Sequence, residues 1–153
     1  MIETPAAALA IRTIAPHVDV LSVGTNDLTQ YTFAAGRDDP NVNDYFQDGH
    51  AALLRLLEII VQDAGDLPVT LCGELAGREE LLPRLLAIGL RSFSIAPPLI
   101  PGMKERIRSL IEKIKKPDTN CRAFDFVEND FQILTLKPKL ICLSATGSGA
   151  CPP

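Results

Sequence analysis

An amide and a carboxylate, Asn26 and Asp27, closely follow a short apolar run at residues 20–23. An apolar run of this length that ends in polar residues is typical of a buried parallel strand whose carboxyl end carries functional groups. Glu3 and Cys72 stand in the same position after other short apolar segments. Because the carboxyl ends of parallel strands share one edge of a sheet, we expect these side chains to meet there.

The residue types suit a phosphate site with a bound cation. Glu3 and Asp27 can hold Mg²⁺, which takes one or two protein carboxylates and leaves its remaining positions to water and phosphate oxygens. Arg37 can bind a phosphate through two parallel hydrogen bonds. Glycine at Gly24 and Gly73 lets backbone amides approach an anion closely. Together these groups predict a phosphate site.

Each candidate also has a purely structural interpretation. Cys72 can act as an acid at the mouth of the site if its surroundings keep its proton near neutral pH. A free cysteine at the end of an apolar strand is, however, more often a small buried hydrophobe. Glu3 can instead interact with the start of a helix, Asp27 can cap a helix or turn, and Arg37 can be a solvated loop charge.

Strands alternate with helices up to residue 116, which predicts an α/β fold of about four β/α units. The expected strands lie at about residues 19–23, 69–72 and 92–95, after a clipped first strand that ends at Glu3. The expected helices lie at 5–14, 51–64, 78–88 and 102–114, and a long polar loop is expected at 25–47. His17 and His50 fall near element ends without an acidic partner at a diagnostic spacing, so we interpret both as surface or capping residues.

Residues 117–153 differ in character and form a separate tail of unknown structure in this interpretation. Two apolar runs at 131–136 and 140–143 flank Lys137-Pro138, and the chain ends in glycine, serine and proline. A paired hairpin, an unstructured tail and a reading-frame artefact all remain open here. We assign the tail no function.

Length and composition favour one soluble, cytoplasmic domain. The chain has 153 residues, 46% of them hydrophobic, and a net charge of −4. This balance lacks the basic patches of a nucleic-acid binder, and no apolar stretch approaches the roughly 20 residues that span a bilayer. The four cysteines form no CxxC pair, so neither a disulfide framework nor a structural zinc site is expected.

Three motifs together resemble one family. Residues 1–7 (MIETPAA), 24–31 (GTNDLTQY) and 72–77 (CGELAG) are similar, in the same order, to the phosphoenolpyruvate (PEP)-binding barrel of enzyme I of the bacterial phosphotransferase system. The sequence FSIAP at 93–97 resembles the last strand of that barrel. The resemblance covers about residues 1–115. Pyruvate phosphate dikinase and PEP synthase share much of GTNDLTQ, but the first and third motifs are closer to enzyme I.

The resemblance implies roles for particular residues. It makes Glu3 and Asp27 ligands of Mg²⁺, Asn26 and Asp27 contacts of the PEP phosphate, Arg37 a phosphate-binding arginine, and Cys72 the proton donor. In the implied reaction, a mobile domain presents a histidine that takes the phosphoryl group from PEP and later passes it to the carrier protein HPr. Enolpyruvate is protonated to pyruvate.

The chain also departs from the family pattern. The motifs belong to the second half of a (β/α)8 barrel, so we expect residues 1–116 to form a partial TIM barrel. The first half, with two further arginines, and the domains that carry the histidine and the HPr-binding surface are absent. We therefore expect no phosphotransfer by the chain alone, and we expect the unpaired edges and an apolar interior to favour association. A fragment of dikinase or synthase, or a noncatalytic remnant of the family's dimerisation domain, is the alternative.

Overall fold

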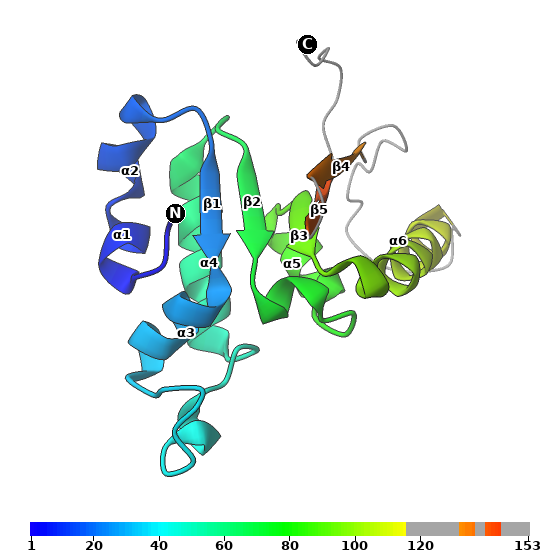
Figure 1. Ribbon diagram of the computed structural model, residues 1–153. Helices are drawn as coiled ribbons and strands as arrows, with labels where there is room; N and C mark the ends of the chain where they lie inside the picture. Colours follow the sequence, from blue (N-terminus) through cyan, green and yellow to red (C-terminus); the bar gives the residue numbers. More distant parts are fainter. Residues whose placement is uncertain (116–131, 137–139, 145–153) are drawn as a thin grey trace.

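The computed structural model describes residues 1–115, 132–136 and 140–144 (Figure 1). The helices are α1 (Pro5–Leu9), α2 (Ile11–Ile14), α3 (Thr25–Phe33), α4 (Ala51–Ala64), α5 (Leu82–Ile88) and α6 (Ile100–Lys115). The strands are β1 (Leu21–Gly24), β2 (Val69–Cys72), β3 (Ser92–Ile95), β4 (Gln132–Leu136) and β5 (Leu140–Ser144). None of the described helices is long and apolar enough to cross a membrane.

The sheet has the order β1-β2-β3-β5-β4. Strands β1, β2 and β3 are parallel neighbours in chain order, as expected for consecutive β/α units. The expected first strand is reduced to one parallel bridge between Ile2 and Val23, with the Ile2 amide donating to the Ser22 carbonyl at 2.7 Å. The mixed α/β class is confirmed, whereas the described residues form an open sheet and no closed barrel.

The antiparallel pair β4 and β5 extends this sheet. Strand β5 pairs with β3, and β4 pairs with β5. Of the three alternatives left open for the tail, the structure therefore shows paired strands at the two apolar runs. The connecting residues 137–139 and the terminus at 145–153 lie outside the described residues.

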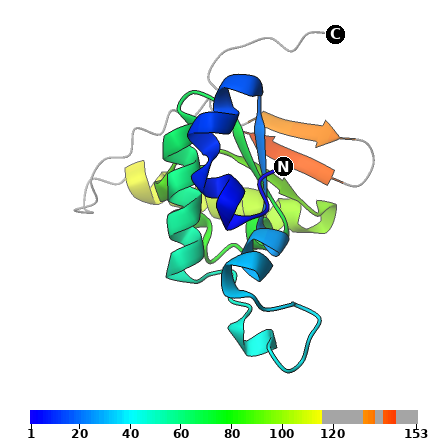
Figure 2. The ribbon, with the colours of Figure 1, turned by 90° about the vertical axis from the view of Figure 1, so that its left-hand side faces the viewer.

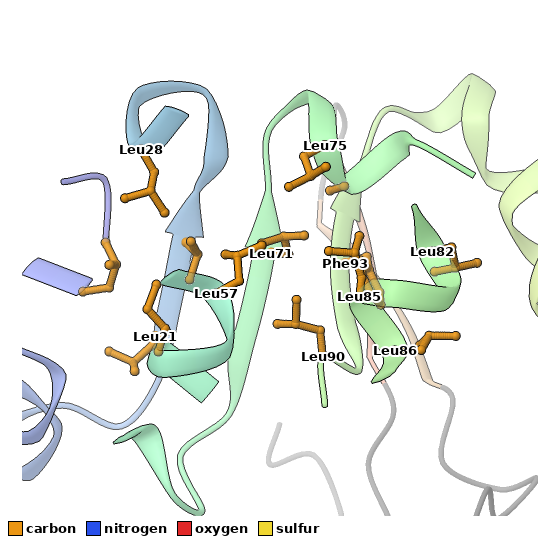
Figure 3. Close-up of a cluster of buried hydrophobic side chains, with 14 of the residues drawn as sticks. Leu21, Leu28, Leu57, Leu71, Leu75, Leu82, Leu85, Leu86, Leu90 and Phe93 are labelled. Carbon is orange, nitrogen blue, oxygen red and sulfur yellow. The ribbon is translucent and has the colours of Figure 1, made fainter. Parts of the chain in front are cut away.

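Side chains alternate between the two faces of the parallel strands. Leu21, Leu71 and Phe93 are at most 3% exposed and point toward the helices. Figure 3 shows these three side chains in one layer with Leu57 of α4 and Leu85 of α5. Burial of such side chains contributes about 1.5–3 kcal/mol each, so this layer holds the helices on the sheet.

The opposite face of the strands carries small polar side chains. Ser22 lies beside Thr70, and Thr70 lies beside Ser92, in the parallel register. The hydroxyl groups of Thr70 and Ser92 are 3.0 Å apart, within hydrogen-bond distance. In Figure 1, β1 and β2 stand in front of α4 with no helix across them. The expectation of an apolar interior is therefore wrong, because the alternate residues of these strands are serine, threonine, cysteine and glycine.

Helix α4 agrees with the expected bounds because its pattern is strongly amphipathic. Leu53, Leu57 and Ile60 are at most 1% exposed and lie along one side of the helix. The helix ends at Gly65, whose φ of 59° suits glycine. In Figure 2, α4 runs along one side of the strands, while α1 and α2 lie in front of the β1 edge.

The segment expected to be a polar loop begins with a helix instead. Helix α3 buries Leu28 and Thr29. The Thr29 hydroxyl donates to the Thr25 carbonyl at 2.7 Å, and the Thr32 hydroxyl donates to the Leu28 carbonyl at 2.6 Å. These bonds satisfy polar side chains within the helix, so a polar composition did not exclude helix formation.

The helix expected at 78–88 starts later than predicted. Residues 74–77 form a 3₁₀ helix, η3 (Glu74–Gly77), and α5 begins at Leu82 with Pro83 in its first turn. Proline is tolerated there because the first amide groups of a helix have no internal partner. Gly89 ends the helix with a φ of 106°, as expected.

Candidate functional site

The candidate residues come from the carboxyl ends of β1 and β2. Figure 1 shows the arrowheads of both strands pointing to the end of the sheet where α3 lies. Helix α3 starts directly after β1, with Gly24 as its N-cap residue. Gly73 connects β2 to η3. Because β1 and β2 are hydrogen-bonded in register, with Gly24 opposite Cys72, the two connections are neighbours.

Asn26 links these two connections. Its side-chain Oδ1 accepts a hydrogen bond from the backbone amide of Glu74 at 2.9 Å. The backbone N–H of Glu74 can only donate, so the side-chain oxygen of Asn26 must face it. The side-chain NH₂ group of Asn26 then points away from Glu74. Asn26 thereby offers two N–H donors to another acceptor.

A pocket of about 280 Å³ adjoins this link. Its lining comes from α3, the β2–η3 connection and the end of β3: Asn26, Gly73, Glu74, Gly77, Ser94, Ile95, Ala96 and Leu99. Asn26 is thus the predicted site residue that lines the pocket, and Glu3, Asp27, Arg37 and Cys72 do not. The pocket combines the Asn26 amide with the Ser94 hydroxyl, the exposed carboxylate of Glu74, and small and apolar neighbours.

The Cys72 thiol lies on the polar face of the sheet and is partly buried. Its Sγ donates to the Val23 carbonyl at 3.2 Å and lies 3.6 Å from the Ser22 hydroxyl. A thiol can make the first of these bonds only while it holds its proton. Cys72 is thus partly buried with two polar neighbours, and its role as a proton donor stays a prediction beside the structural alternative of a small buried hydrophobe.

Glu3 and Asp27 occupy adjoining parts of the same edge. A Cβ atom on Gly24 would lie 2.7 Å from Glu3 Oε1, so glycine leaves the room in which the Glu3 carboxylate lies. Asp27 is exposed in the first turn of α3 and makes no side-chain capping bond there. Within the described part of the chain, no group of three or more His, Cys, Asp or Glu side chains could hold a metal ion. A metal site shared by Glu3 and Asp27 stays a prediction.

Arg37 lies apart from the other candidates. Its Nε is 3.8 Å from Asp38 Oδ2, and its side chain is 44% exposed. This geometry agrees with the solvated loop charge considered as its alternative. The loop that carries Arg37 projects beyond the carboxyl ends of the strands (Figure 1).

The histidines have the structural roles expected for them. His50 caps α4, because its Nδ1 accepts a hydrogen bond from the Ala52 amide at 3.1 Å. Its ring also meets the Phe33 ring edge-on, with centroids 5.0 Å apart. His17 is exposed at the end of a 3₁₀ helix, Ala15–His17.

Two residues that adjoin the candidates were not singled out from the sequence. Thr25 is 1% exposed, and its hydroxyl donates to the Cys72 carbonyl at 2.8 Å. Ser22 lies beside the Cys72 thiol. Both belong to or adjoin the GTNDLTQY motif, but their partners are about 50 residues away in the sequence, so local spacing gave no sign of these contacts.

Comparison with known proteins assigns the chain to a family. Residues 1–111 match the model of a family described as PEP-utilising enzyme, PEP-binding domain. The chain belongs to this family. The match includes all three motifs and every candidate site residue, so the resemblance stated from the motifs is confirmed.

Individual relatives agree with this assignment. The chain is 45% identical to a phosphoenolpyruvate-protein phosphotransferase of Mycoplasma pneumoniae over 98 residues, 63% of this chain and 17% of the relative. It is 36% identical to the protein of the same name in Mycoplasma genitalium over 142 residues, 86% of this chain and 25% of the relative. It is 34% identical to multiphosphoryl transfer protein 1 of Escherichia coli K12 over 134 residues, 84% of this chain and 16% of the relative.

The chain thus spans a quarter or less of the length of these relatives. Their names describe transferases, and the family is one of enzymes.

Proposed function

We propose that the chain is the PEP- and Mg²⁺-binding part of a PEP-protein phosphotransferase. The observation that carries this proposal is the bond from the Glu74 amide to Asn26 Oδ1, which leaves the Asn26 NH₂ free beside a pocket. Phosphate oxygens only accept hydrogen bonds, so an amide held in this orientation suits them. The pocket lies where parallel α/β folds bind phosphorylated ligands, at the carboxyl ends of the strands.

The carboxylates support a place for Mg²⁺ next to this amide. Glu3 and Asp27 would hold the ion, because Mg²⁺ accepts one or two protein carboxylates and completes its shell with water and phosphate oxygens. Two carboxylates without a third protein ligand fit that preference. When bound, Mg²⁺ supplies charge neutralisation on the phosphoryl group. Arg37 would assist only after the Arg37 side chain leaves Asp38 and turns toward the pocket.

Cys72 would supply the proton that completes the reaction. The P–O bond of PEP breaks as a histidine nitrogen on another segment takes the phosphoryl group, and enolpyruvate remains. The S–H bond of Cys72 then breaks, a C–H bond forms at the methylene carbon, and pyruvate results. In the structure, the Cys72 thiol donates to the Val23 carbonyl, and this step would use the same S–H proton.

The full reaction needs parts that lie beyond these 153 residues. We propose that HPr and the phosphorylated histidine act through the domains that precede this region in the longer relatives, and that the whole enzyme is a homodimer. The isolated chain should bind PEP weakly and transfer no phosphoryl group.

Isothermal titration calorimetry of the purified chain with PEP, in the presence of Mg²⁺, tests the proposal. Glu3→Gln and Asp27→Asn should each weaken PEP binding by about tenfold or more, since loss of groups around a metal costs 10–100-fold. Asp66→Asn is the matched control. It removes the same charge from an exposed residue before the amino end of β2, at the opposite end of the sheet, and should leave binding unchanged.

The outcome is decisive in either direction. Binding that falls with both site variants and not with Asp66→Asn supports the metal and substrate assignment. Affinity that is the same in the unmodified chain, Glu3→Gln and Asp27→Asn would remove these carboxylates from the site.

A further inference from the structure

Two hydrogen bonds join the start of α3 to the end of β2, across 47 or 48 residues of sequence. The Thr25 hydroxyl donates to the Cys72 carbonyl at 2.8 Å. The Glu74 amide donates to Asn26 Oδ1 at 2.9 Å. Thr25 and Asn26, which are consecutive at the start of α3, therefore bind the two residues on either side of Gly73, Cys72 and Glu74.

The fit around Gly73 is tight enough to depend on glycine. Its φ is 98°, and a Cβ atom there would lie 2.3 Å from Thr25 Oγ1 and 2.9 Å from Asn26 Oδ1. Real Cβ contacts are not that short, so any other residue would push the two connections apart. Both hydrogen bonds form only because the backbone at Gly73 comes close to Thr25 and Asn26, which the absence of a side chain permits.

Thr25 differs from the other threonines of α3 in the direction of its bond. The hydroxyls of Thr29 and Thr32 donate to carbonyls four residues earlier in the chain, within the same helix. Thr25 is the first residue of α3, so no preceding helical turn offers its hydroxyl a carbonyl. Its hydroxyl reaches the neighbouring strand instead, in a position that is 1% exposed.

We propose that Thr25 is a positioning residue for the candidate site. Its hydroxyl fixes the carbonyl of Cys72, so that the thiol on β2 and the Asn26 amide on α3 keep one separation and one orientation. Without this bond, the Cys72–Gly73–Glu74 backbone can move away from α3, and the bond from Glu74 to Asn26 weakens with it. The catalytic meaning of this role rests on the function proposed above, whereas the mechanical role does not.

Three threonine variants separate positioning from simple stability. Thr25→Val keeps the shape of the side chain and removes the donor, and Thr25→Ser keeps the donor. Thr29→Val is the matched control. Thr29 is equally buried in the same helix, and its hydroxyl bonds only to the helix itself.

The first measurement is amide hydrogen exchange resolved by residue with NMR, for Glu74 relative to Ile60 in the core of α4. Thr25→Val should speed exchange at Glu74 about tenfold relative to Ile60, as expected for loss of about 1.4 kcal/mol of local hydrogen bonding. Thr29→Val should leave that ratio within about twofold, and Thr25→Ser should restore it. A ratio that changes equally in Thr25→Val and Thr29→Val would overturn the proposal.

The second measurement is PEP affinity with Mg²⁺, as above. Thr25→Val should weaken it several-fold more than Thr29→Val. If the unmodified chain binds PEP and these two variants bind it equally, Thr25 does not position the site. If the unmodified chain does not bind PEP, the proposed function fails, and the exchange ratio at Glu74 alone decides whether Thr25 holds the two connections together.

Discussion

Replacement of Gly73 by alanine tests the closest backbone contact of the candidate site. Gly73 combines a φ of 98° with a ψ of −175°, a region that glycine alone adopts readily. Gly65 is a suitable comparison, because its φ is also positive at 59° and nothing lies within 4 Å of a Cβ atom added there. Both substitutions strain the backbone, but only Gly73→Ala meets a neighbouring side chain.

The expected difference follows from that contact. Backbone strain should cost about 1–3 kcal/mol at each position. At Gly73, the new methyl group would overlap Thr25 Oγ1, a buried atom, and overpacking of this kind costs about 1–3 kcal/mol. Relief of the overlap would break the bond from Thr25 to the Cys72 carbonyl, at about 0.5–1.5 kcal/mol. Gly73→Ala should therefore destabilise the chain by roughly 2–4 kcal/mol more than Gly65→Ala.

Urea unfolding followed by far-UV circular dichroism measures this difference, because the chain has no tryptophan for fluorescence. With a slope of about 2 kcal/mol per molar urea, the middle of the usual range for small proteins, the midpoint of Gly73→Ala should lie roughly 1–2 M below that of Gly65→Ala. If Gly73→Ala does not fold while Gly65→Ala does, Gly73→Ala is again the less stable of the two variants, as expected. Equal midpoints for the two variants would show that the close contact with Thr25 carries no energy, and the reasoning would be wrong.

Two further predictions concern contacts that hold the neighbouring loops. His50→Ala should lower stability by about 1 kcal/mol in thermal unfolding, because Ala52 loses its capping acceptor, and His50→Ser should recover most of this loss. Arg78 Nε lies 2.9 Å from Asp48 Oδ2, an ion pair without hydrogen-bond geometry, and the Asp48 side chain is 9% exposed. Arg78→Ala should therefore destabilise the chain more than the double variant with Asp48→Ala, since the single change leaves a buried carboxylate unpaired; the reverse order in urea unfolding would contradict this.

The sequence predicted the elements whose periodicity is strong. The β2 and β3 strands and α4 have the expected bounds, because apolar residues recur at the period of the element. Helix α3 was missed because its buried positions include threonines. The hydroxyl of Thr29 bonds within the helix and makes such a position compatible with burial, which composition alone does not reveal.

The sequence placed two candidate residues at the strand ends where the structure has them, but it did not predict their contacts. The motifs placed Asn26 and Cys72 at neighbouring strand ends, and the structure has both there. Arg37 lies in a loop with Asp38 as its partner, and no local pattern sets the path of such a loop. The sequence did not predict the contact of Thr25, because its partner is the backbone carbonyl of Cys72, and every residue type carries such a carbonyl.

The polar face of the sheet bears on the alternative that this chain acts as an association module. Hydrophobic association gains about 25 cal/mol for each Å² of apolar surface removed from water. Ser22, Thr70 and Ser92 present hydroxyls on this face, and covering them would remove from water the hydrogen-bonding capacity that their contacts within the chain leave unused. A partner for this face must therefore bring matching polar groups or leave water between the surfaces. A second copy that simply covers the strands would gain little, so this face gives no support to an association module.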